Sequence, residues 1–528
     1  MRRSILTVIM IFACLMWMDS PSAKRGRIPA QGHAAAGDMW LRELVPASAL
    51  LAVEVRDLER RWEEIRCIQP IAGLQDAILS CAGMKASLLP RLMGNHAVLF
   101  LARSDHYPHV VPIAILRPAD PDQAVAVLAG IPTVSFRFGR GALWVGPSGA
   151  EDLLEHFSQE EGARLVEVLP FEEMQSRLPS GGLIRGLVNP KSLQEFLQDL
   201  NDRAGSAMHQ WPIAAAVAEL GTVRYAAFRR DLEDGELVTD GLVVYDVPLL
   251  PLEVQRIFNP QATPVSLPSE LPANTLAAFA FRPEAQAWVP WLRYLAASDP
   301  RGPLRNLGFW IDEFEARYRR DLVRDLFGAL GDRAWLLALS ADNGRMAEFV
   351  LIVEARESPV LEATLLDSMS WMGEQLWLGT FGLIWPKTWL EDGRGRVVHG
   401  MTLHTPVSRT PGLRFELADG YLVIAGNPAA MQAGRALVEK IRQVAFDGGA
   451  ASSGLPVHGT FWIRGAELGR LIRAGAESPS FSGCICNAIA DLAAESDTLG
   501  IELRYGHDAV RFHGRLRIAT LRTKYSIP

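Results

Sequence analysis

Aromatic and imidazole side chains that could bind a ligand are concentrated in one stretch of the second half of the chain. They are Trp371, Trp377, Trp385, Trp389, His399 and His404. Tryptophan rings exposed in a cleft can stack on sugar rings or cover an apolar ligand, while polar side chains complete the contact. The polar candidates in the same stretch are Lys387, Glu391, Asp392 and Arg394. This composition predicts binding of an apolar or carbohydrate ligand.

The same tryptophans have a second interpretation. Four of the fourteen tryptophans of the chain lie between residues 371 and 389. Large aromatic side chains most often serve packing, so these rings can equally form a small core that attaches the stretch to the rest of the protein. Packing is the commoner role, and ligand binding is the hypothesis that would give the stretch a function.

The chain lacks the short motifs of several common enzyme classes. It contains no glycine-rich phosphate loop, no HExxH and no GxSxG. His106 and His109 lie in a polar stretch (SDHYPH), where surface histidines are the simpler interpretation. The five-residue spacing of His399 and His404 matches neither a helix nor one face of a strand. The sequence therefore predicts no catalytic residue, no metal site and no cofactor, and it favours a non-enzymatic protein.

Length and charge narrow the function further. The chain has 528 residues, enough for two or more domains, and 49% of them are hydrophobic. This composition is that of a folded globular protein rather than a disordered one. The formal net charge is -7, whereas proteins that bind nucleic acid depend on basic surfaces. Nucleic acid is therefore not a predicted partner.

The first 19 residues have the composition of an export signal. Arg2 and Arg3 precede an apolar run over 5–18, and small residues follow. These features are typical of a bacterial signal peptide, whereas a membrane-spanning helix needs about 20 apolar residues. Export to the periplasm or another extracytoplasmic location is predicted, with residues 1–19 either cleaved or retained as a membrane anchor. Residues 20–38 carry no periodicity and are predicted to form a flexible tether.

Cysteine usage leaves lipid attachment and disulfide pairing open. Cys14 follows Ile11, Phe12 and Ala13, which is similar to the lipid-attachment site of bacterial lipoproteins except for the bulky Phe12. An even number of further cysteines permits disulfides in an oxidising compartment. They are Cys67, Cys81, Cys484 and Cys486. Burial as small apolar residues is the alternative interpretation.

Two stretches with the same order of features indicate an internal duplication. Pro121 follows Gly94 by 27 residues and Pro359 follows Gly331 by 28, with two apolar strands between in each case. Equal spacing across a shared strand, turn and strand predicts two copies of one module. The predicted divisions of the chain are a first domain at 39–259, a proline-rich linker at 260–272 and a second domain at 273–528.

The two predicted copies differ in length at one place. Gly141 follows Pro121 by 20 residues, but Gly420 follows Pro359 by 61. The second copy therefore carries an insertion of about 40 residues, roughly 371–407, which contains the tryptophans and histidines described above. Because binding residues are commonly carried on loops of a rigid scaffold, this insertion is the predicted functional site.

Strand and helix patterns predict an α+β fold. Each half begins with strand, helix, strand, strand, helix and strand, which is the order of the ferredoxin-like βαββαβ unit. Strands joined by tight turns are antiparallel, so both domains are expected to be mainly antiparallel sheets with helices on one face. Tight turns are predicted at 139–141 and at 418–420, where glycines separate apolar strands.

The opening of the first half resembles that of a poorly characterised group of exported bacterial envelope proteins. Leu44 and Pro46 precede an apolar strand at 50–55, and Leu271 and Pro272 precede the first strand of the second half. The resemblance implies export and the general plan of the fold. It implies no activity and no site residues.

These observations together predict an exported, non-enzymatic binding or scaffold protein of the cell envelope. Its predicted partner is an envelope protein or an apolar or carbohydrate ligand. Two alternatives belong to other classes of protein. A carrier or sensor of a lipid-like molecule would need an apolar cavity between the halves. A hydrolase of an envelope polymer would need two carboxylates facing each other across a cleft.

Overall fold

The computed structural model describes most of the chain between residues 42 and 518. The described residues are 42–56, 94, 96–103, 110–131, 134–159, 162–179, 181–203, 214, 216–233, 236–258, 264–268, 270–298, 304–340, 347–356, 359–379, 385–393, 396–404, 409–446, 457–467, 470 and 496–518. The predicted export signal at 1–19, the tether at 20–38, the five cysteines, His106 and His109 lie outside them.

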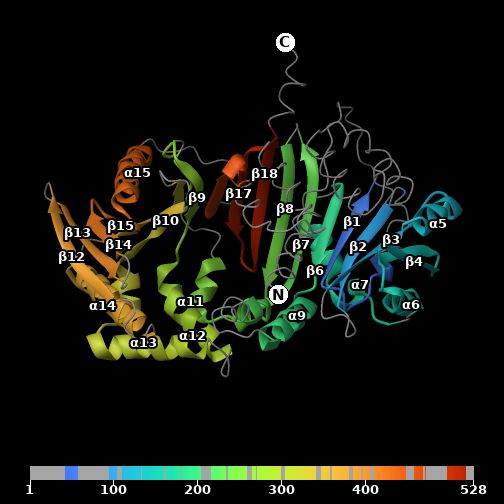
Figure 1. Cartoon of the computed structure of the whole chain (residues 1–528), viewed down its shortest axis with the longest axis horizontal. Coiled ribbons are helices and arrows are strands. Elements are labelled where there is room, and N and C mark those ends of the chain that lie inside the picture. The colour runs from blue at the N-terminus through green and yellow to red at the C-terminus, as the bar shows by residue number, and fades with distance from the viewer. Residues whose placement is uncertain are drawn as a thin grey trace, which may run out of the picture.

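The described strands form one antiparallel sheet of 18 strands (Figure 1). The first half of the chain contributes β1 (Leu51–Arg56), β2 (His96–Ala102), β3 (Val111–Leu116), β4 (Val134–Gly139), β5 (Ala142–Pro147), β6 (Ile184–Val188), β7 (Val223–Glu233) and β8 (Glu236–Tyr245). The second half contributes β9 (Thr275–Phe281), β10 (Leu330–Ser340), β11 (Ala347–Ala355), β12 (Trp385–Gly393), β13 (Arg396–His404), β14 (Arg409–Ala418), β15 (Tyr421–Ala425), β16 (Gly459–Arg464), β17 (Ser496–Tyr505) and β18 (Ala509–Ile518). The predicted α+β class with antiparallel pairing is confirmed.

Helices connect these strands. The α-helices are α5 (Pro121–Ala129), α6 (Glu151–Gln159), α7 (Leu165–Val168), α8 (Phe171–Arg177), α9 (Pro190–Arg203), α11 (Leu252–Gln255), α12 (Trp288–Ser298), α13 (Arg305–Tyr318), α14 (Pro359–Gly379) and α15 (Pro428–Phe446). Short turns of other helix types are η1 (Arg42–Leu44), η3 (Val247–Leu249), η4 (Arg256–Phe258), η5 (Ala285–Ala287), η6 (Leu322–Leu326) and η7 (Phe327–Ala329). Within the described part of the chain, no helix combines the length and apolar character needed to cross a membrane.

Strand pairing places the two halves of the chain at the two ends of the sheet. Counted outward from the centre, the first half runs β8, β7, β6, β1, β2, β3, β5, β4. The second half runs β18, β17, β16, β9, β10, β11, β15, β14 and then continues with β13 and β12. The halves meet where β8 pairs with β18. Figure 1 shows the series from β4 at the right to β12 at the left.

The ferredoxin-like order is not confirmed. Strand β1 lies between β2 and β6 and pairs with both in the antiparallel sense, whereas a split βαβ unit brings parallel strands together. The order of elements along the chain is compatible with either arrangement. The pairing is decided by contacts between β1 and β6, which are far apart in the sequence.

Helices cover both faces of the sheet rather than the single face that was expected. On β2, Ala97 packs with α5 while its neighbour Val98 packs with α6. On β15, Leu422 packs with α14 while its neighbour Val423 packs with α15. Successive side chains of a strand point to opposite faces. We therefore call the two faces the α6/α15 face and the α5/α14 face.

The two predicted tight turns are formed by pairs of residues with positive φ. Arg140 and Gly141 have φ of 53° and 72°, and Asp419 and Gly420 have φ of 57° and 80°. Positive φ at both central positions is typical of the two-residue hairpin turn whose twist matches that of the flanking strands. These turns fix the registers of β4 with β5 and of β14 with β15.

Candidate functional site

Six titratable side chains occupy adjacent positions on six neighbouring strands at the centre of the sheet. We call this set the charged row, and its members are Glu54 (β1), Arg185 (β6), Arg229 (β7), Asp240 (β8), His513 (β18) and Glu502 (β17). Each is directly opposite the next in the strand register. Directly opposed residues project from the same face of a sheet. The charged row therefore lies on one face, across the junction of the two halves.

Apolar residues continue the same transverse row on both sides. Beyond Glu54 the next residue is Val98, in the core that includes α6. Beyond Glu502 the row passes through Thr460 to Ala280, in the core that includes α15. The charged row thus separates two helix-covered cores on the α6/α15 face.

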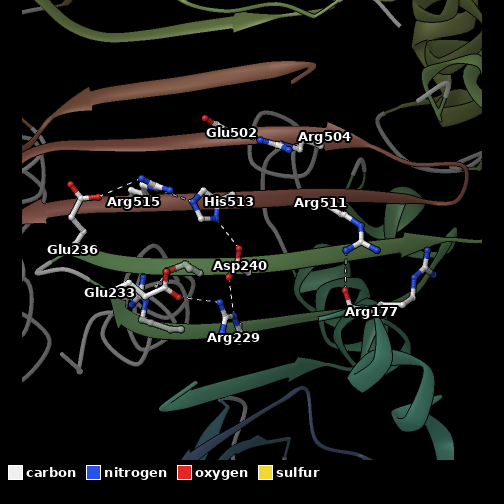
Figure 2. Close-up of polar contacts among 12 residues, drawn as sticks. Arg177, Arg229, Glu233, Glu236, Asp240, Glu502, Arg504, Arg511, His513 and Arg515 are labelled. Atoms are coloured by element: carbon white, nitrogen blue, oxygen red, sulfur yellow. Dashed lines mark hydrogen bonds and ion pairs between the residues drawn. The ribbon is translucent and has the colours of Figure 1, made fainter. Parts of the chain in front are cut away.

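Hydrogen bonds connect three members of the charged row, Arg229, Asp240 and His513, across the junction (Figure 2). Arg229 Nε donates to Asp240 Oδ2 at 2.8 Å, and His513 Nδ1 lies 2.7 Å from Asp240 Oδ1. Arg515, two residues along β18, donates from Nε to His513 Nε2 at 2.9 Å. A single carboxylate on β8 therefore binds a cationic side chain of its own half and a histidine of the other half.

The bond from Arg515 determines where the neutral His513 ring carries its proton. Because Nε2 accepts from Arg515, the proton is on Nδ1, which donates to Asp240. A histidine held by an aspartate resembles the base of a hydrolase, but in such enzymes the second nitrogen faces the nucleophile. Here that nitrogen faces a guanidinium. The arrangement is suited to positioning charges rather than to transferring a proton.

The two ends of the charged row differ in exposure. The side chain of Glu54 is 6% exposed, that of Asp240 is 19%, that of His513 is 28% and that of Glu502 is 42%. At the buried end, Arg56 donates to Glu54 at 3.2 Å, so this carboxylate is compensated within the protein. At the other end, charged atoms on β17 and β18 face solvent.

A second group of ion pairs joins the halves beside the charged row. Arg177 of α8 donates from Nη1 to Asp508 Oδ2 at 2.9 Å, and Asp508 lies in the turn between β17 and β18. The guanidinium of Arg177 holds the pKa of Asp508 below its usual range. Glu173 accepts from Arg177 and from the hydroxyl of Tyr225. These contacts tie α8, in the first half, to the last hairpin of the second half.

A cavity of about 40 Å³ lies at the buried end of the charged row. Glu54 and Arg185 line it together with apolar side chains such as Val45, Phe171 and Met174. This volume holds only a few water molecules, whereas pockets for small ligands usually measure several hundred Å³. All of its lining residues belong to the first half, so this cavity does not bear on the predicted alternative of a carrier with an apolar cavity between the halves.

The predicted ligand-binding tryptophans whose side chains are described lie on opposite sides of the sheet. The ring of Trp371, in α14, packs edge-on against the ring of Phe314, in α13, with the two ring centres 6.1 Å apart. Trp389, in β12, packs against the core that includes α15. Trp377 lies in α14 and Trp385 in β12, and their side chains are outside the described residues.

The two predicted histidines lie on β13. Nε2 of His399 lies 2.7 Å from Oε1 of Glu362, in α14. The His399 ring stacks on the ring of Phe415, with the two ring centres 4.9 Å apart. His404 is opposite Trp385 in the register of β13 with β12. The described contacts thus bring His399 together with α14 and not with Trp389. Among the residues that the structure describes, no group of three or more histidine, cysteine, aspartate or glutamate side chains could hold a metal ion.

The described residues of the predicted insertion at 371–407 lie in regular elements. Helix α14 has 21 residues, compared with 9 in α5 at the corresponding place in the first half. Strands β12 and β13 follow it and extend the sheet beyond β14. Lys387, Glu391 and Asp392 lie on β12, the last described strand at this edge, and Arg394 lies outside the described residues.

The charged row was not among the predicted site residues. One feature of the sequence could have indicated it: charged residues recur at every second position. Residues two apart in a strand share a face, as Arg511, His513 and Arg515 do, and as Glu502 and Arg504 do. The same alternation is typical of any strand with a solvated face. The sequence does not indicate that these strands pair at the centre of the sheet.

Comparisons with known proteins assign the chain to no family. It matches no protein-family model and no curated protein. A solved structure titled "Structure of crystal form I of TP0453" is similar with a TM-score of 0.21 and 7% identity, covering 45% of this chain and 74% of that chain. A likeness this weak carries no argument. The resemblance to a group of exported envelope proteins is not confirmed by these comparisons.

Replacing Trp389 with alanine is expected to lower the free energy of unfolding by about 2–3 kcal/mol. The Trp389 ring lies over Gly400, its Nε1 donates to Thr402 at 3.1 Å, and the guanidinium of Arg414 lies 5.1 Å from the ring centre. Leu390→Ala is the matched control, because Leu390 is the next residue of β12 and is 61% exposed. Urea denaturation measures both, and equal midpoints for the two variants would argue against a packing role for Trp389.

Proposed function

We propose that this chain is an exported, non-enzymatic binding protein of the bacterial envelope, and that it binds a partner protein through the exposed end of the charged row. The arrangement that carries the proposal is the line of Asp240, His513 and Glu502 across the junction of the two halves. Residues 1–19 would serve as the export signal or as a retained anchor. The partner would be a polar protein surface with charges of both signs.

The energetic cost of the charged row supports a binding role. Partly buried ions lose hydration that their pairing does not always repay, and apolar residues of similar size are often equally stabilising or better. The strands on both sides use apolar residues at the same positions of the α6/α15 face. The stability of the fold therefore does not require charged residues at these positions. Electrostatic complementarity to a partner protein does require them.

Alternation of sign favours a protein partner over a uniformly charged polymer. Arg515 is 63% exposed, Glu502 is 42% exposed and Arg504 is 33% exposed, so cations and anions are interleaved over β17 and β18. A polyanion would be repelled by the carboxylates, and a polycation by the guanidiniums. A protein surface can match both signs in register.

Site-specific photo-cross-linking in the native bacterium tests this proposal. A photoreactive residue replaces Glu502 or Arg515 in one set of strains and Arg317 of α13 in the control. Arg317 is matched in exposure, at 47% against 42% for Glu502, and lies away from the charged row. We expect one protein adduct at 502 and 515, recovered in the envelope fraction, and none at 317. Absence of an adduct at both positions would refute the proposal.

A further inference from the structure

Four buried nitrogen atoms without a hydrogen-bond partner gather beside the exposed end of the charged row. They are Arg282 Nε, Arg282 Nη1, His458 Nε2 and Arg504 Nε. Buried donors in folded proteins almost always have an acceptor, so an unpaired cluster indicates a place for an ordered water or an ion. The three residues are neighbours, because His458 accepts from the backbone N–H of Arg282 and donates its own N–H to the carbonyl of Leu503, next to Arg504.

His458 is the centre of this cluster. It is fully buried, and its Nδ1 accepts from the backbone N–H of Tyr505 at 3.0 Å. The neutral ring therefore carries its proton on Nε2, the nitrogen that has no partner. Burial, together with Arg282 and Arg504, holds the pKa of His458 below its usual range. The imidazole is thus a neutral donor held between two guanidiniums.

Positive charge exceeds negative charge around these donors. Arg511 is directly opposite Arg504 in the register of β18 with β17, and Figure 2 shows the two on neighbouring strands. Like charges directly opposed across two strands are destabilising unless something compensates them. Arg504 pairs with Glu502 and Arg282 with Glu284, whereas Arg511 donates to the backbone carbonyl of Arg177. Three arginines thus share two carboxylates.

We propose that Arg282, His458 and Arg504 bind a phosphate group, with Arg511 contributing its charge. Guanidiniums present paired N–H donors that match the oxygens of phosphate. A phosphate oxygen can also accept a hydrogen bond from Nε2–H of the neutral His458 ring. One negative charge would balance the excess of arginine. Arg504, which is one-third exposed while Arg282 is 13% exposed, provides the approach from solvent.

Glu284 limits how the group can be held. Its Oε1 lies 2.7 Å from Arg282 Nη2 but outside hydrogen-bonding geometry. Burial raises the pKa of Glu284, which lowers the repulsion that an approaching anion would meet. The ligand would therefore contact Arg282 through Nε and Nη1, the two atoms that Glu284 leaves without a partner.

Isothermal titration of the purified full chain with inorganic phosphate tests this inference. We expect saturable binding at one site, weakened about tenfold or more by Arg504→Gln, because a charge-assisted hydrogen bond is lost. Arg293→Gln is the control: it removes an arginine of α12 whose side chain is 42% exposed and belongs to neither site, and binding should be unchanged. Phosphate should also raise the unfolding temperature of the wild type more than that of Arg504→Gln.

A second titration uses vesicles of phosphatidylcholine with and without phosphatidic acid. Binding of inorganic phosphate identifies a site for the free ion or a small ester. Binding only to phosphatidic acid vesicles, lost in Arg504→Gln, identifies a lipid headgroup, and both results support the inference. If neither probe binds, or if Arg504→Gln binds as tightly as wild type, the inference is wrong. These titrations do not depend on the partner protein, so failure to bind phosphate can be told apart from absence of a protein adduct at residue 502.

Discussion

Replacing Asp240 with alanine is expected to lower the free energy of unfolding by about 3 kcal/mol. Asp240 accepts from Arg229 at 2.8 Å and lies 2.7 Å from His513, and the side chain of Arg229 is only 12% exposed. Without the carboxylate, a nearly buried guanidinium loses its main anionic partner and the link to the second half is broken. Removing one partner of a buried pair costs far more than the pair itself contributes.

Glu233→Ala is the matched control for this variant. Glu233 also binds Arg229, at 3.2 Å, but its side chain is 51% exposed. Exposed ion pairs contribute about 0.2–1 kcal/mol, so the control should lose little stability. Guanidinium chloride denaturation measures both variants. Equal losses in Asp240→Ala and Glu233→Ala would mean that the charged row is as well solvated as an ordinary surface.

Replacing Gly241 with alanine is expected to destabilise the junction by about 2–3 kcal/mol. Gly241 is opposite Phe512 in the pairing of β8 with β18. A methyl group at Gly241 would lie 1.9 Å from the Phe512 ring, so the ring or the strands must move. This contact lies on the α5/α14 face, on the other side of the sheet from Asp240. The two variants therefore test the same junction from both faces.

Gly500→Ala provides the comparison within the adjoining strand. A methyl group at Gly500, in β17, would meet no atom within 4 Å. This substitution is expected to be neutral or to stabilise the protein by about 0.5 kcal/mol, since alanine restricts the unfolded chain. Thermal unfolding measures both variants. If Gly241→Ala unfolds at the same temperature as Gly500→Ala, the close packing of Phe512 over Gly241 is incorrect.

Local structure was predicted where neighbouring residues determine it. The apolar strands after Gly94 and Gly331 are β2 with β3 and β10 with β11, which pair as antiparallel neighbours. Gly141 and Gly420 indicated the hairpins at 139–141 and 418–420, because glycine adopts the positive φ of the second turn position without a steric cost. These features depend on short sequence distances, so composition and spacing suffice.

Pairing between distant segments could not be predicted from the same patterns. Residues 236–244 of β8 pair with residues 509–517 of β18, and nothing in either strand encodes the other as its neighbour. Alternating charges such as those of Arg511, His513 and Arg515 are typical of any strand with a solvated face. The density of tryptophans at 371–389 predicted a binding site there, yet Trp371 and Trp389 pack against different elements. Side-chain type alone identified the aromatic stretch as a candidate site. The charged row can be identified only from the order in which the strands pair in the sheet.

The salt dependence of cross-linking at residue 502 tests the proposed binding surface most directly. Surface electrostatic contacts weaken as the Debye length shortens from about 14 Å to about 4 Å between roughly 0.05 and 0.5 M salt. The charged row predicts a single protein adduct at residue 502 whose yield falls several-fold over this range of salt concentration. The control position 317 is expected to give no adduct. An adduct of equal yield at 502 and 317, or one that salt does not change, would contradict it.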